Sequence, residues 1–168
     1  ARRQRQMCIR DSYCIDCFIC TRCDYQHLRR EEHLEMEKLI LVSHGTFCEG
    51  IKDSIEMILG PQAHLYTVAL SPQEGPEDFE KNFMAHIEAG DKVTVFADLL
   101  GGTPSNTVAK KIMNGADYDL YVGMNLPMII SYINGQMIGE QPDYVKKAQE
   151  GIVNVNTLLN QDDDDDDE

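Results

Sequence analysis

One histidine of this chain lies where its type and neighbours could support phosphoryl chemistry. His44 follows the apolar run Leu39–Val42 and is itself followed by a glycine, so little side-chain bulk can bury it. Asp98 likewise comes directly after an apolar run, Val93–Ala97. An imidazole nitrogen attacks phosphorus well when the other ring nitrogen keeps its proton and donates it to a carboxylate. His44 and Asp98 are therefore predicted to be a catalytic pair, with the histidine as nucleophile and the aspartate orienting it.

Short segments containing glycine and threonine accompany both residues. Gly45 and Thr46 follow the histidine, and Gly102 and Thr103 lie a few positions after the aspartate. Each pair precedes a predicted helix, whose first turn has unpaired N–H groups and a partial positive charge. We expect Gly45–Phe47 and the region of Thr103 to donate backbone hydrogen bonds to a phosphoryl group, without a metal ion or a cofactor. Thr103 is also predicted to be the N-cap of its helix.

The other histidines, Cys48 and Met57 are not predicted to be catalytic. Cys48 and Met57 are predicted to pack in the core. The remaining histidines are given little weight, because they lie at a strand start, in an amphipathic helix or near the N-terminus: His64, His86, His27 and His33.

The elements that must position the pair alternate between strand and helix. Strands are predicted at 39–42, 65–70, 93–97 and 118–122, and helices at about 47–59, 76–89, 103–114, 128–133 and 143–150. This alternation predicts an α/β fold: a doubly wound, mainly parallel four-stranded sheet with helices on both faces. Ligands bind beyond the carboxyl ends of such strands. His44 and Asp98 should therefore face one crevice.

Composition limits the partners that the protein can have. The 168 residues are 42% hydrophobic, enough for a core, and contain no run of eighteen apolar residues that would predict a membrane span. The net charge of −14 argues against nucleic acid or an anionic membrane as the main partner. Half of this negative charge, −7, lies in residues 162–168, so the net charge says little about the fold.

Three regions are predicted along the chain. Residues 1–35 carry seven arginines and no sustained periodicity, and are expected to be an appended, disordered leader, since Met36 directly precedes the first strand. The alternative for this region is a metal module, because Cys14, Cys17, Cys20 and Cys23 supply four soft ligands. Residues 36–160 are the predicted domain, and 161–168 a disordered acidic tail. The absence of a secretory apolar stretch predicts a cytoplasmic protein with reduced thiols.

Three motifs in this region also resemble a known family. They are Leu41–Gly45 (with Gly50 and Ser54 following), Asp98–Asn106 and Gly123–Met128. Together they resemble the IIA domain of the mannose-type (mannose/fructose/sorbose) sugar phosphotransferase system, over about Met36 to Leu159. The resemblance implies a cytoplasmic phosphocarrier that accepts a phosphoryl group from phospho-HPr and passes it to a IIB partner, with the membrane IIC and IID components involved only indirectly.

The resemblance also assigns roles to residues. His44 matches the family's phosphorylated histidine, Asp98 the acid that hydrogen-bonds it, and Thr103 a hydroxyl near the phosphate. The family is dimeric, with a last, antiparallel edge strand exchanged between subunits, for which Ile152–Val155 is the β-prone candidate. Since no IIB region follows in this sequence, a separate IIA subunit is expected. The sugar itself is not predicted, because IIA does not touch it.

Two other functions remain as alternatives. A phosphohydrolase resembling the histidine phosphatases would also place His-Gly after the first strand, but it would need an arginine before the histidine, where this chain has Ser43. A receiver-like signalling domain would be phosphorylated on Asp98, but it would need an acidic pair after the first strand to bind magnesium. Phosphohistidine survives alkali whereas an acyl phosphate does not, so the stability of the phosphoprotein in alkali separates the cases.

Overall fold

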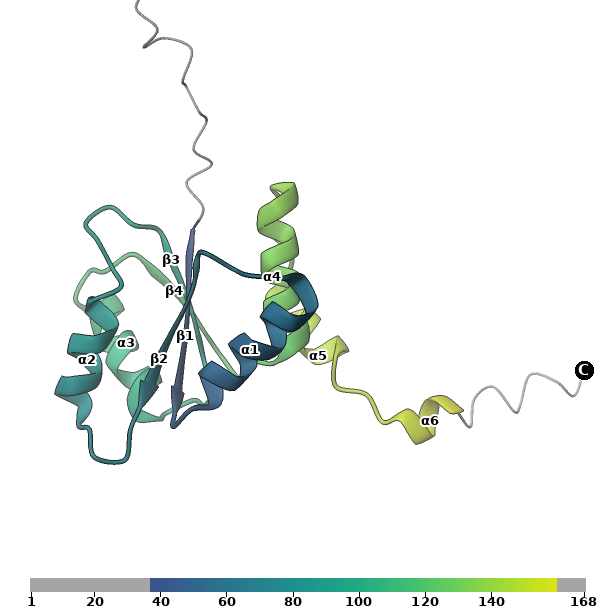
Figure 1. Cartoon of the computed structure of the whole chain (residues 1–168), viewed down its shortest axis with the longest axis horizontal. Helices are drawn as coiled ribbons and strands as arrows, with labels where there is room; N and C mark the ends of the chain where they lie inside the picture. Colours follow the sequence, from purple (N-terminus) through teal and green to yellow (C-terminus); the bar gives the residue numbers. More distant parts are fainter. Residues whose placement is uncertain (1–36, 160–168) are drawn as a thin grey trace, which may run out of the picture. The chain divides into compact units, whose positions relative to one another are not determined.

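The fold is built on one parallel sheet. The computed structural model describes residues 37–159 and contains four strands, at Lys38–His44 (β1), Leu65–Leu70 (β2), Val93–Ala97 (β3) and Tyr118–Val122 (β4). Their order is β2-β1-β3-β4, and every neighbouring pair is parallel (Figure 1). All four predicted strands are confirmed.

Helices cover both faces of this sheet (Figure 1). They span Phe47–Leu59 (α1), Pro76–Met84 (α2), Thr103–Met113 (α3), Leu126–Ile138 (α4), Tyr144–Glu150 (α5) and Val155–Leu159 (α6). Residues of α1, α4 and α5 pack on one face, and residues of α2 and α3 on the other. The predicted doubly wound α/β architecture is therefore confirmed.

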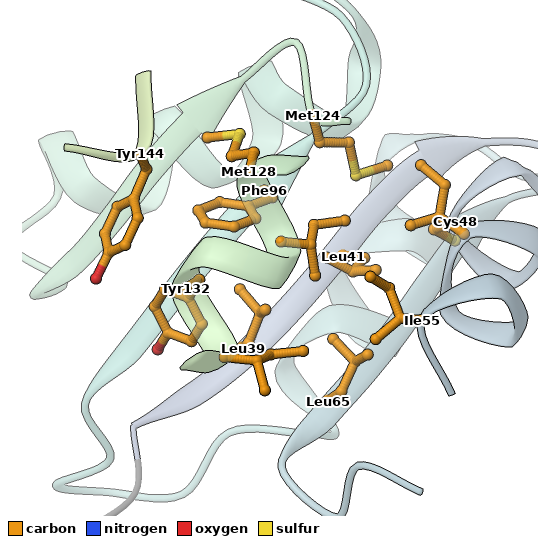
Figure 2. Close-up of a cluster of buried hydrophobic side chains, with 13 residues drawn as sticks. Leu39, Leu41, Cys48, Ile55, Leu65, Phe96, Met124, Met128, Tyr132 and Tyr144 are labelled. Atoms are coloured by element: carbon orange, nitrogen blue, oxygen red, sulfur yellow. The ribbon is translucent and has the colours of Figure 1, made fainter. Parts of the chain in front are cut away.

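Strand β1 supplies both halves of the core. Successive side chains of a strand point to opposite faces, and accordingly Leu39 and Leu41 join the cluster under α1 and α4 (Figure 2), whereas Ile40 and Val42 join the cluster under α2 and α3. All four are almost completely buried. A strand covered on both faces is continuously apolar, which is the pattern that the sequence shows here.

The order of the strands fixes where the site lies. The chain leaves β1 to form β2 on one side and then returns to form β3 on the other side of β1. The carboxyl ends of β1 and β3 therefore flank the point where the strand order reverses, which is where sheets of this class bind ligands. His44 ends β1, and Asp98 directly follows β3.

Some predicted helix details are wrong. Helix α2 ends at Met84 rather than near residue 89, because His86 and Ile87 donate to Phe83 and Met84 in tighter i→i−3 turns. Helix α4 is longer than the predicted 128–133, since it is capped at its start by Asn125 and ends only at Gly139, which has a positive φ of 71°.

Met57 of α1 lies at the surface and not in the core. Cys48, Ile51 and Ile55 form the buried stripe of this helix, and the core position predicted for Cys48 is confirmed. Met57 is 86% exposed, so its predicted core position is wrong. The side chain lies two positions from Ile55, which places it about 200° round the helix, on the opposite face.

The predicted last strand at Ile152–Val155 does not form within the single chain. Residues 152–154 have no regular secondary structure, and α6 begins at Val155. Every residue of 151–159 is exposed. A β-prone segment forms a strand only where another strand offers hydrogen bonds, and no strand of residues 37–159 pairs with this one.

Two predicted regions lie outside the described residues. They are the leader 1–35, including the Cys14–Cys23 cluster, and the acidic tail 161–168. Within the described part of the chain, no helix is long and apolar enough to cross a membrane.

Candidate active site

The two predicted catalytic residues are in direct contact. Nδ1 of His44 lies 2.9 Å from Oδ2 of Asp98, and the backbone N–H of His44 donates to the same oxygen at 2.8 Å. The parallel pairing of β1 with β3 produces this contact, because Val42 pairs with Ala97 and the next residues leave the sheet together. The histidine side chain is 44% exposed and the carboxylate 15%. The ring is therefore held by one nitrogen and open to solvent.

The carboxylate of Asp98 stays ionised. Burial raises its pKa, but the backbone N–H and ring of His44 and the N–H of Leu99, which donates to Oδ1 at 2.7 Å, outweigh burial and lower the pKa below its usual value. An ionised Asp98 can only accept hydrogen bonds. Nδ1 of His44 must then carry the proton, which makes Nε2 the nucleophilic nitrogen of the neutral ring. Among residues 37–159, none hydrogen-bonds to Nε2.

Gly102 lies against the histidine ring. A Cβ added there would overlap Cε1 of His44 and approach Nε2 at 3.1 Å. Because only a residue without a side chain leaves room for the ring, Gly102 supports His44 from the side of α3. Asn106 holds the same loop, since its side-chain amide donates to the carbonyl of Gly101 at 2.9 Å.

Ser43 fixes the turn that carries His44, a role that was not predicted from the sequence. Its side chain is fully buried, and its hydroxyl donates to the carbonyl of Gly45 at 3.1 Å and accepts from the N–H of Cys48 at 2.9 Å. The hydroxyl thereby joins the end of β1 to the first turn of α1. A polar residue within an apolar strand run was the feature of the sequence that could have identified it.

Two helices begin beside the pair, at Thr46 for α1 and Gly102 for α3, and neither N-cap residue caps its helix with a side chain. The N-cap side chains of α4 and α5 do cap their helices, since Asn125 and Asp143 accept from backbone N–H groups there, and in α1 the N–H of Cys48 is bound by Ser43. The other first-turn N–H groups of α1 and α3 lie at the end of the sheet that carries His44 and Asp98.

Two predicted details of these helix starts change. The N–H of Gly45 is not a free donor, because it binds the carbonyl of Leu70 at 2.9 Å. Gly45 instead makes the turn, for which its positive φ of 55° suits glycine. Thr103 is not the N-cap of α3, since Gly102 occupies that position and Thr103 is the first helical residue. Thr103 is half-buried, and Thr46 is exposed.

Exposed apolar side chains flank the pair along the chain. Leu99 and Leu100 directly follow Asp98 and are 60% and 78% exposed, and Phe47 at the start of α1 is 50% exposed. We call these three residues the apolar rim.

Comparison with known proteins identifies the relatives of this fold and site. The family described as "PTS system fructose IIA component" matches residues 38–149. The chain belongs to this family. The match includes both His44 and Asp98, together with the helix starts around them.

Individual relatives of this IIA chain agree with the family match. The sorbose-specific EIIA component of Lacticaseibacillus casei is 26% identical over 67% of this chain and 86% of that protein, and the fructose-specific EIIA component of Bacillus subtilis is 28% identical over 59% and 70%. The crystal structure of the phosphotransferase system component EIIA from Streptococcus agalactiae superposes with a TM-score of 0.67 at 28% identity, covering 73% of this chain and 99% of that one. This chain is therefore a IIA component of a sugar phosphotransferase system, of the mannose type.

Proposed function

We propose that this IIA component carries a phosphoryl group on Nε2 of His44, accepting it from phospho-HPr and passing it to a IIB partner in the cytoplasm. The observation that carries the proposal is the contact of Nδ1 of His44 with the ionised Asp98. As the N–P bond of phospho-HPr breaks, an N–P bond forms at Nε2. The Nδ1 proton stays on the ring and becomes part of an imidazolium–carboxylate pair.

The charge of the phosphoryl group needs stabilisation during this transfer. No arginine occurs after Arg30 in the sequence, so a guanidinium clamp from the domain is not available. The first-turn N–H groups of α1 and α3 are the donors that we assign instead, from Thr46 and from the region of Thr103. Gly102 contributes by its lack of a side chain. Such backbone donors act on the phosphate without a metal ion.

The surroundings of the His44 ring suit transfer of a phosphoryl group from one protein and onto another. The side chain of His44 is 44% exposed, so its nitrogen can reach a phosphoryl group that remains attached to another protein. The apolar rim of Phe47, Leu99 and Leu100 offers the contact area that a transient interface needs. We assign the docking of HPr and IIB to this rim.

Asp98 itself is a poor phosphoryl acceptor. Its two carboxylate oxygens already accept from two nitrogens of His44 and one of Leu99. Phosphorylation of this carboxylate would break these hydrogen bonds. The receiver-like alternative is therefore not favoured.

We also propose that the active unit is a homodimer. Strand β4 is an edge of the sheet, and residues 151–159 expose five large apolar side chains: Ile152, Val153, Val155, Leu158 and Leu159. Exposed sheet edges and exposed apolar segments are both commonly covered by a partner. A second copy of the chain would cover them.

The test is to incubate the full chain with phosphoenolpyruvate, enzyme I and HPr, and then to map the phosphorylated residue. We expect one phosphoryl group per chain on His44, stable to alkali, and its transfer to an added IIB protein. His44→Ala should accept none. Phosphorylation of His44→Ala, or an alkali-labile phosphoprotein, would refute the proposal.

A further inference from the structure

A groove lies at the end of the sheet opposite to His44. Its volume is about 420 Å³, and it is lined by the start of β1 and β2 and by the last turns of α1 and α4. Its apolar wall includes Leu39, Leu59, Leu65 and Ile133. Leu39 and His44 are five residues apart on β1, so about 17 Å of strand separates the groove from the ring. Phosphoryl transfer at His44 therefore does not use it.

A buried carboxylate forms part of the wall. Glu37 is 8% exposed; its Oε1 accepts from the hydroxyl of Thr94 at 3.1 Å, and its Oε2 accepts from the amide of Gln136 at 3.2 Å. Lys92 is 3.6 Å from Oε1 and is 60% exposed, so it approaches from the solvent side. Each carboxylate oxygen can accept two hydrogen bonds. Oε2 accepts from Gln136 alone among the described residues and therefore has capacity for one more donor.

A second buried polar group lines the same groove. Tyr132 is 2% exposed, and within the described residues its hydroxyl makes no hydrogen bond of ordinary length, although the side chains of Thr94 and Glu37 lie beside it. Figure 2 shows this hydroxyl pointing away from Phe96 and Met128. Burial raises the pKa of Tyr132 well above its usual value, and the hydroxyl therefore stays neutral, able both to donate and to accept. A buried polar group without a partner is uncommon, and a ligand atom would satisfy it.

We propose that this groove binds a small organic cation, a primary amine carried on an apolar body. The ammonium group donates to Oε2 of Glu37 and to the hydroxyl oxygen of Tyr132, and the apolar body packs against Leu39, Leu65 and Ile133. Charge complementarity selects the amine, because a carboxylate attracts a cation and accepts the hydrogen bonds that an ammonium group donates. The volume lies within the range of small-molecule sites.

The test uses phenethylamine and its neutral analogue 2-phenylethanol, titrated into the full chain and followed by amide NMR shifts. We expect saturable binding of the amine in the millimolar range, with shifts confined to the groove, and binding of the alcohol at least fivefold weaker. Equal binding of amine and alcohol, shifts elsewhere, or no saturable binding would each overturn the proposal.

Two variants test the polar contacts. Tyr132→Phe keeps the ring and removes only the hydroxyl, and it should weaken amine binding about three- to tenfold, while leaving alcohol binding and phosphoryl uptake at His44 unchanged. Glu37→Gln should remove the preference for the amine. Unchanged affinity for the amine in Tyr132→Phe would refute the assigned contact. An unaffected preference in a folded Glu37→Gln protein would refute the charge argument.

Discussion

At the scale of single residues, we expect the hydrogen bond of His44 to Asp98 to speed the proposed transfer. Asp98→Asn keeps the shape of the side chain but removes the charge that stabilises the imidazolium. A hydrogen bond to a charged group contributes about 1.5–3 kcal/mol, so uptake from phospho-HPr should slow by roughly ten- to a hundredfold. Rapid-quench measurement of uptake tests this, with circular dichroism as the folding control. An unchanged rate would remove the role of the carboxylate and leave His44 as carrier.

The contact of Gly102 with the ring makes a second residue-scale prediction. Gly102→Ala places a methyl group where Cε1 of His44 lies, so the ring must rotate away from Asp98. Uptake should fall by at least about tenfold. Gly50→Ala is the matched control, because a Cβ at Gly50 meets nothing within 4 Å. Gly50→Ala should raise the free energy of unfolding in urea by about 1 kcal/mol, because alanine favours a helix more than glycine does. A Gly102→Ala protein with normal phosphoryl uptake would contradict the assigned packing of Gly102 against the ring.

At the scale of elements, the junction of β1 and α1 depends on one hydroxyl. Ser43→Ala leaves the buried N–H of Cys48 without its acceptor, which should lower the free energy of unfolding by about 1–3 kcal/mol. Ser71→Ala, at the end of β2, should change it by less than about 0.5 kcal/mol. Urea unfolding of both variants measures the difference. Equal stability of the two would show that the Ser43 hydroxyl does not hold the junction.

At the scale of the whole molecule, the tyrosines of the core make stability depend on alkaline pH. Burial raises the pKa of Tyr132, and also those of Tyr121 and Tyr144. These groups stay neutral in the folded protein, whereas in the unfolded chain they ionise near pH 10. Stability is therefore fully present below about pH 10 and is lost as the pH rises further, by up to about 1.4 kcal/mol per pH unit for a group that stays neutral in the folded protein.

Thermal unfolding between pH 9 and 11 measures this loss. Tyr132→Phe should lose stability less steeply than the wild type over this range, because one ionising group is removed. A parallel decline in both proteins would mean that Tyr132 does not contribute.

The proposed dimer is also a property of the whole molecule. Deletion of residues 152–168 removes the exposed apolar side chains of the C-terminal segment and should shift the association equilibrium toward monomer. Sedimentation at micromolar concentration tests this, with deletion of residues 160–168 as the control for loss of the acidic tail. A monomeric full chain, or a truncated chain that associates as strongly, would refute the proposal.

The sequence alone determined the strands, their order of alternation with helices, and the pairing of His44 with Asp98. These features follow from short-range patterns, because continuous apolar runs are buried strands and the carboxyl ends of parallel strands share one edge of a sheet. The helix boundaries were less well predicted, since tighter turns end α2 and the caps of α4 lengthen it.

Only the tertiary structure decided what each of these residues touches. The overlap of Gly102 with the ring, the hydrogen bond from Gly45 to Leu70 and the burial of Glu37 with Tyr132 all join residues from different elements. The exposure of Met57 and Phe47 and the helical end of the segment after Gly151 were settled in the same way. The physical reason is that packing and hydrogen-bond satisfaction depend on neighbours in space, whereas periodicity and strand-end position depend only on neighbours along the chain.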